Sequence, residues 1–115
     1  MPACAAPLSP WVDLEGLGES MVTKAEDDPM VHKPMIEQMG KTYVPNGDLR
    51  NPLAAPLYGD LRGLPPLLIQ VGARETLLDD AVRMSDKAKK AGVPVELEVW
   101  DGLIHVWQIF ASRLD

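Results

Sequence analysis

The pattern of apolar and polar residues is clearest in the second half of the chain. Residues 67–71 form a largely apolar run of strand length between two prolines and a glycine, which predicts a strand buried on both faces of a sheet. Residues 93–100 alternate between apolar and polar side chains, which predicts an edge strand with one buried face. Between them, residues 77–91 place apolar side chains at helical spacing and end at Gly92, which predicts a helix.

Three further segments have weaker patterns of the same kind. Residues 3–8 are small and apolar, and we expect them to form the first strand. Residues 34–43 begin with a proline and continue with apolar residues at helical spacing, so they predict a helix. Near the end, a wide apolar stripe predicts a last helix that packs on the sheet, formed by Leu103, Val106, Trp107, Phe110 and Leu114.

The connections in this pattern are long. Residues 15–28 have few periodic apolar residues and are expected to form a surface connection, and residues 44–66, rich in proline, an extended linker that packs on a larger body. The resulting order βαβαβα predicts an α/β fold with three parallel strands and flanking helices. Because such a sheet must be covered on both faces, residues 1–115 are interpreted as part of one larger domain.

Composition and charge exclude several classes of partner. The net charge of −6 disfavours binding to nucleic acid or to an anionic membrane surface, since both attract basic proteins. No apolar run approaches the roughly 18 residues of a membrane span. The single cysteine, Cys4, allows no intrachain disulfide, so we expect a cytoplasmic protein.

Two side chains with complementary chemistry follow the predicted neighbouring strands. Glu75 lies just beyond residues 67–71, and His105 lies just beyond residues 93–100. The carboxyl ends of parallel strands meet at one edge of a sheet, and neighbouring strands are about 4.8 Å apart, so the two side chains can reach each other. A carboxylate that orients a histidine is the arrangement of a hydrolytic triad. The acidic pairs Asp27-Asp28 and Asp79-Asp80 lack a histidine at ligand spacing, so no metal site is expected.

Several segments resemble one enzyme family. The segments are Pro65-Pro66-Leu67-Leu68-Ile69-Gln70-Val71-Gly72, Glu75-Thr76-Leu77-Leu78-Asp79-Asp80, Gly92-Val93 and Trp100-Asp101-Gly102-Leu103-Ile104-His105-Val106-Trp107, joined by Ser9-Pro10-Trp11-Val12-Asp13-Leu14 and Pro52-Leu53-Ala54-Ala55-Pro56-Leu57-Tyr58. Together they are similar to the C-terminal part of the hormone-sensitive-lipase-like esterases of the α/β-hydrolase fold. The resemblance spans essentially the whole chain.

This resemblance implies roles for particular residues. It implies that His105 is the general base and acid of a Ser-His-acid triad that hydrolyses carboxylic esters without a cofactor, and that Glu75 is the acid, where the family more often has aspartate. Asp79 is the runner-up, followed by Asp80. We favour Glu75 because the sequence from Thr76 to Asp79 resembles a capping box, which would occupy Asp79 at the start of the helix.

The nucleophile of such a triad is not found in these 115 residues. They contain no Gly-x-Ser-x-Gly motif. No serine has a glycine two positions before it and another two positions after it; the serines considered are Ser9, Ser20, Ser85 and Ser112. We therefore expect a fragment or a truncated product whose missing portion carries the serine and the oxyanion hole. The alternative is a non-catalytic remnant or a dimerising interaction module. The resemblance also implies a homodimer formed through the edge strand at residues 93–100.

Overall fold

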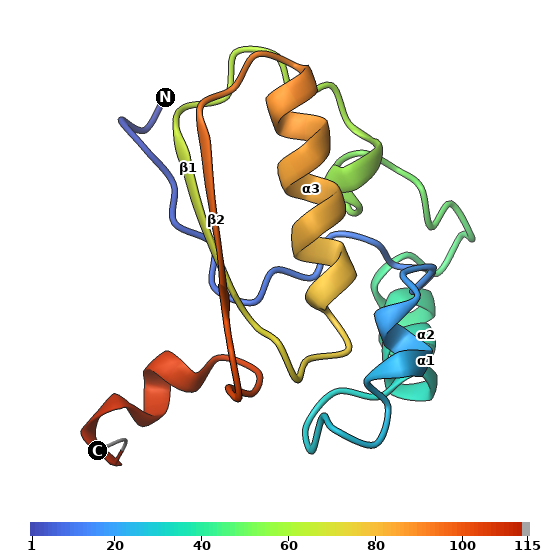
Figure 1. The fold of residues 1–115 in the computed structure, drawn as a ribbon. Helices are drawn as coiled ribbons and strands as arrows, with labels where there is room; N and C mark the ends of the chain where they lie inside the picture. The colour runs from blue at the N-terminus through green and yellow to red at the C-terminus, as the bar shows by residue number, and fades with distance from the viewer. Residues whose placement is uncertain (114–115) are drawn as a thin grey trace.

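A short parallel sheet forms the centre of the molecule. The computed structural model describes residues 1–113, and in it strand β1 (Leu67–Gly72) pairs in parallel with β2 (Val95–Trp100), with Leu67 opposite Val95. The N-terminal segment runs along the other edge of β1 and makes two isolated parallel bridges, from Ala5 to Leu67 and from Leu8 to Gln70 (Figure 1). The predicted parallel arrangement of three segments is confirmed, although the first segment forms bridges rather than a full strand.

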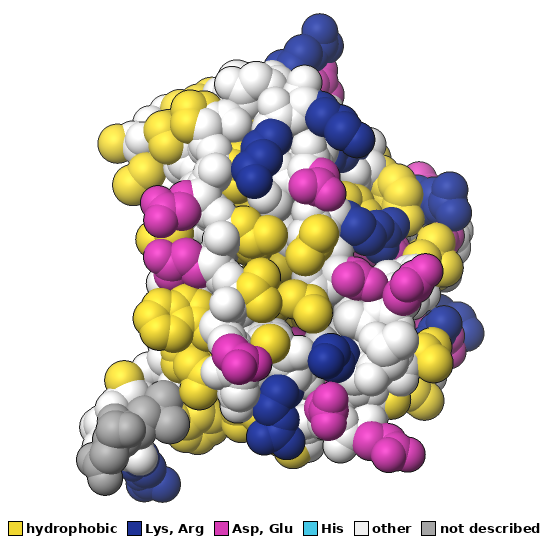
Figure 2. Space-filling model, in the orientation of Figure 1, with side chains coloured by type: hydrophobic (Ala, Val, Ile, Leu, Met, Phe, Trp, Pro, Cys, Tyr) yellow, Lys and Arg dark blue, Asp and Glu magenta, His cyan; other side chains and the backbone are white. Residues whose placement is uncertain are grey.

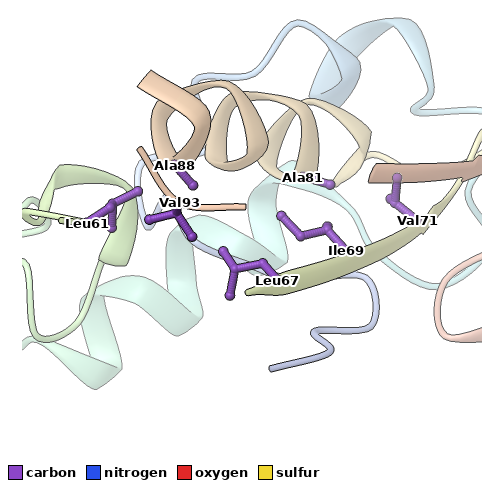
Figure 3. Packing of buried hydrophobic residues seen from close by; sticks show 7 residues of the cluster. All are labelled: Leu61, Leu67, Ile69, Val71, Ala81, Ala88 and Val93. Carbon is purple, nitrogen blue, oxygen red and sulfur yellow. The ribbon is translucent and has the colours of Figure 1, made fainter. Parts of the chain in front are cut away.

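Helix α3 (Leu78–Lys90) connects the two strands and covers one face of the sheet. The alternate β1 residues Leu67, Ile69 and Val71 point toward this helix, which presents Ala81 and Ala88 (Figure 3). Because alanine side chains are short, the helix backbone can lie close to the strand. The opposite face of β1 is only half buried in the described residues, so burial of the strand on both faces stays a prediction for a larger domain.

The connection at residues 15–28 is more ordered and more buried than predicted. It contains the short helix α1 (Ser20–Thr23), and Met21 is almost fully buried. Helix α2 (Lys33–Tyr43) follows and begins one residue before the predicted start, with the proline in its first turn. Met21 packs with Ile36 of α2 in a second, smaller apolar cluster. The sequence showed no helical periodicity here because α1 has only four residues.

The proline-rich stretch at residues 44–66 contains turns and a short 3-10 helix, η1 (Pro56–Tyr58). We predicted an extended linker that packs on a larger body. The turns and η1 show that the stretch is not extended, and within the described residues it packs on α3, where the Leu57 carbonyl accepts a hydrogen bond of 2.6 Å from Lys87 Nζ. Ala55, Leu57 and Leu61 are buried, and these apolar side chains fix the stretch in place without a long regular element.

The last part of the described chain also differs from the prediction. It forms a 3-10 helix, η2 (Trp107–Arg113), that leads away from the sheet (Figure 1) rather than lying on it. Trp107 is buried, but the following residues are more exposed, including Ile109 at 68%. Leu114, the last residue of the predicted apolar stripe, lies outside the described residues. Within residues 1–113, no helix has the length and apolar character needed to cross a membrane.

Candidate active site

The structure brings Glu75 and His105 together at the carboxyl ends of β1 and β2. Nδ1 of His105 lies 3.0 Å from Oε2 of Glu75. The Glu75 side chain is fully buried, whereas the His105 side chain is 20% exposed. A ring that donates Nδ1–H to a buried carboxylate keeps the lone pair of Nε2 free to accept a proton. This is the geometry required of a general base and of the acid that orients it.

A close approach between two loops makes this contact possible. The backbone N–H of Ala73 donates to the Trp100 carbonyl at 2.9 Å, and that of Arg74 donates to the Leu103 carbonyl at 3.2 Å. A side chain on Gly72 would collide with the Leu103 carbonyl. Glycine at the end of β1 therefore lets the loop after β2 cross directly over β1 and carry His105 to Glu75.

The two oxygens of Glu75 have separate partners. Oε1 accepts a hydrogen bond of 2.6 Å from the Gly72 N–H and one of 2.7 Å from the Ser9 hydroxyl, which leaves Oε2 for His105. A buried carboxylate is costly unless it is hydrogen-bonded, and these contacts supply that compensation. Arg74, the nearest cation in sequence, donates instead to the Asp27 carbonyl, so neutral donors hold Oε1.

Ser9 is the residue of this site that sequence reasoning missed. We set it aside because it is not in a nucleophile motif, and its hydroxyl indeed contacts Glu75 rather than His105. It is buried, it lies 66 residues from Glu75, and it also accepts a hydrogen bond of 3.0 Å from the Val106 N–H. The end of the first apolar run at Ser9-Pro10 was the only signal in the sequence, and it does not indicate this contact.

Asp79, the runner-up for the acid, is occupied elsewhere. Its Oδ2 accepts a hydrogen bond of 2.8 Å from the Ser20 N–H at the start of α1. The predicted capping box does not form, because α3 begins only at Leu78 and the buried Thr76 hydroxyl contacts the Val31 carbonyl at 3.0 Å. Asp79 is thus engaged in holding α1, not in capping its own helix.

Asp80 contacts a different part of the N-terminal segment. Its Oδ2 accepts hydrogen bonds of 2.9 and 3.0 Å from the N–H groups of Val12 and Asp13. Burial raises the pKa of Asp80 to about 6, against the lowering effect of these hydrogen bonds. In the part of the chain that the structure describes, no three His, Cys, Asp or Glu side chains are grouped so that they could hold a metal ion.

The chain is similar to one protein family and to several enzymes. The profile of a family described as alpha/beta hydrolase fold matches residues 1–109. An acetyl-hydrolase of Streptomyces hygroscopicus is 45% identical over 107 residues, which are 93% of this chain and 36% of that protein. An esterase of Acinetobacter venetianus is 35% identical over 112 residues, 96% of this chain and 37% of the relative.

Solved structures agree with these sequence matches. The crystal structure of an esterase from the bacterial hormone-sensitive lipase family has a TM-score of 0.97 and 52% identity, covering 99% of this chain and 38% of that one. The crystal structure of EstE5 soaked with ethyl alcohol has a TM-score of 0.96 and 47% identity, with the same coverage. The chain therefore spans a little over a third of the length of these relatives.

Proposed function

The chain belongs to the alpha/beta hydrolase fold family, and on this basis we propose that it supplies the histidine and the acid of a Ser-His-acid triad that hydrolyses carboxylic esters. The observation that carries the proposal is the 3.0 Å contact between His105 Nδ1 and the buried carboxylate of Glu75. The relatives named as an acetyl-hydrolase and an esterase support the same reaction class.

In the proposed reaction, the histidine carries protons and the acid stabilises it. A serine from a portion outside these 115 residues attacks the ester carbonyl, and Nε2 of His105 takes the serine proton. Glu75 stabilises the imidazolium that results, and His105 then protonates the leaving alkoxide. Water, activated by the same histidine, hydrolyses the acyl-enzyme. Glu75 is proposed as the acid in preference to Asp79 because Asp79 Oδ2 accepts its hydrogen bond from Ser20.

The proposal can be tested in an enzyme completed with the missing portion. Residues 1–115 replace the matching part of the Streptomyces hygroscopicus acetyl-hydrolase, and hydrolysis of p-nitrophenyl acetate is measured. His105→Ala should lower kcat by about 10³-fold or more, because both proton transfers lose their carrier. His32→Ala is the matched control, since the only other histidine is exposed and precedes α2, and it should leave kcat unchanged.

The same experiment tests the alternative of a non-catalytic interaction module. That alternative predicts that hydrolysis in the completed enzyme does not depend on His105. If His105→Ala hydrolyses the ester as fast as His32→Ala does, the triad proposal fails.

We also propose that the protein forms a homodimer through residues 93–100. In the described residues, the outer edge of β2 has no strand paired with it, and Val99 and Trp100 are nearly half exposed. Figure 2 shows hydrophobic and acidic side chains along the side of the molecule that β2 occupies. An unpaired edge offers backbone donors and acceptors to a second copy.

The backbone pattern of β2 suggests a selective test of the dimer. The carbonyls of Pro94 and Trp100 point toward β1, so by alternation the N–H of Val99 points outward. Proline is tolerated on the free side of an edge strand. Val99→Pro should therefore keep the fold and convert the dimer to a monomer in sedimentation at micromolar concentration. A native chain that sediments as a monomer would contradict the proposal.

A further inference from the structure

Two residues with an unusual backbone conformation meet at the candidate site. In residues 1–113, the non-glycine residues with positive φ are Ser9, at 47°, and Val106, at 45°. This left-handed region is disfavoured for residues with a side chain, and most of all for a β-branched residue such as valine. The Val106 N–H donates to Ser9 Oγ at 3.0 Å, so both unusual residues lie at the two ends of one hydrogen bond.

The same Ser9 hydroxyl also makes a hydrogen bond to the carboxylate of Glu75. The Ser9 hydroxyl has one proton to donate and donates it to Glu75 Oε1 at 2.7 Å, while its oxygen accepts from Val106. Val106 directly follows His105 in the chain. A single hydroxyl therefore connects the acid to the backbone that carries the histidine.

We propose that Ser9 is a positioning residue for the Glu75–His105 pair. Its hydroxyl fixes the rotation of the carboxylate, so that Oε2 faces Nδ1 of the histidine, and it holds the loop of His105 against the end of β1. This inference rests on the proposed esterase function. It adds a residue that takes no part in proton transfer and contacts no reacting atom.

The backbone of Ser9 has a structural contact that is separate from those of its hydroxyl. The Ser9 N–H already donates to the Gln70 carbonyl at 2.7 Å, which fixes the N-terminal segment along β1. This backbone contact remains when the side chain is removed. The polar contacts of the hydroxyl are to Glu75 and Val106, so removal of the hydroxyl affects the site selectively.

The test uses two substitutions of Ser9 in the completed esterase. Ser9→Ala removes the hydroxyl, and Ser9→Gly removes it while favouring the positive φ. We expect both to lower kcat by roughly 10- to 100-fold, since a small misplacement of the acid and base weakens proton transfer. KM should stay within about twofold, because Ser9 does not contact substrate. If Ser9→Gly has native kcat, the hydroxyl is not needed and the inference is wrong.

A matched control separates this effect from the loss of any buried serine. Ser85 on α3 is also fully buried, but its hydroxyl has no hydrogen-bond partner among the described residues. Ser85→Ala should therefore retain the native kcat. If Ser85→Ala lowers kcat as much as Ser9→Ala does, the effect is not specific to the site and the inference is overturned.

A double variant shows whether Ser9 acts through Glu75. If it does, Glu75→Gln combined with Ser9→Ala should be no slower than Glu75→Gln alone, because the carboxylate that Ser9 positions is already lost. Independent, multiplying losses would overturn the inference while leaving the triad proposal intact. By contrast, native activity of Glu75→Gln would reject the assignment of the acid itself, so the two failures are distinguishable.

Discussion

Two buried carboxylates lie only five positions apart, yet their surroundings differ. Glu75 and Asp80 are both fully buried, and both accept hydrogen bonds from the N-terminal segment. The second oxygen of Glu75 faces the partly exposed His105, whereas Oδ1 of Asp80 has no partner among the described residues. Burial and hydrogen bonding alone therefore do not distinguish the proposed catalytic carboxylate from a structural one. The distinguishing feature is the neighbouring imidazole of His105, which is 20% exposed and has a second ring nitrogen.

A nearby cation further marks the Asp80 region as structural. Asp13, whose N–H donates to Asp80, accepts a hydrogen bond of 2.8 Å from Arg83 and one of 3.2 Å from the Tyr58 hydroxyl. Burial alone would raise the pKa of Asp13, but the contacts with Arg83 and with two backbone N–H groups outweigh it and lower that pKa. This cluster holds the N-terminal segment on α3.

The largest expected effect concerns the acid itself. Glu75→Gln in the completed esterase should lower kcat by about 10³- to 10⁴-fold, because the neutral amide no longer stabilises the imidazolium. Asp79→Asn is the matched control, and it should change kcat only slightly, since Asp79 holds α1. The measurement is the turnover of p-nitrophenyl acetate. The reverse order of the two effects would assign the acid to Asp79.

The second expected effect concerns stability rather than activity. Asp13→Ala should lower the free energy of unfolding by about 4 kcal/mol, because it leaves Arg83 and two backbone N–H groups without their buried acceptor. Urea unfolding of the native and variant chains measures this difference. Glu15→Gln is the control, since its ion pair with Arg50 lies at the surface and should contribute little. Equal stability of Asp13→Ala and the native chain would contradict the structural role.

Local sequence patterns predicted the elements around the sheet but not the contacts between distant segments. Helix α3 and strands β1 and β2 follow from the spacing of apolar residues, and the meeting of Glu75 and His105 follows from the rule for parallel strands. The role of Ser9 could not be predicted, because a hydrogen bond across 66 residues leaves no periodic pattern. The capping box failed for a related reason, since a tertiary contact with the Val31 carbonyl replaced the local one.

The smallest expected effect is the contribution of Asp80 to the pH dependence of stability. Its pKa is about 6 in the folded protein, above the ordinary value of 3.8. Between about pH 4 and pH 6, the unfolded chain therefore releases a proton that the folded chain keeps, so this group makes stability fall as pH rises. The shift of about two units corresponds to roughly 2 to 3 kcal/mol.

The substitution Asp80→Asn isolates this contribution. The amide oxygen can still accept from the N–H groups of Val12 and Asp13, but it has no charge to bury. The difference in unfolding free energy between Asp80→Asn and the native chain should therefore grow in favour of the variant from pH 4 to pH 6 and stay constant above that. A difference that does not change with pH would mean that Asp80 is ionised at its ordinary pKa. The remaining difference between Glu75 and Asp80 would then be that Glu75 has a histidine as its neighbour.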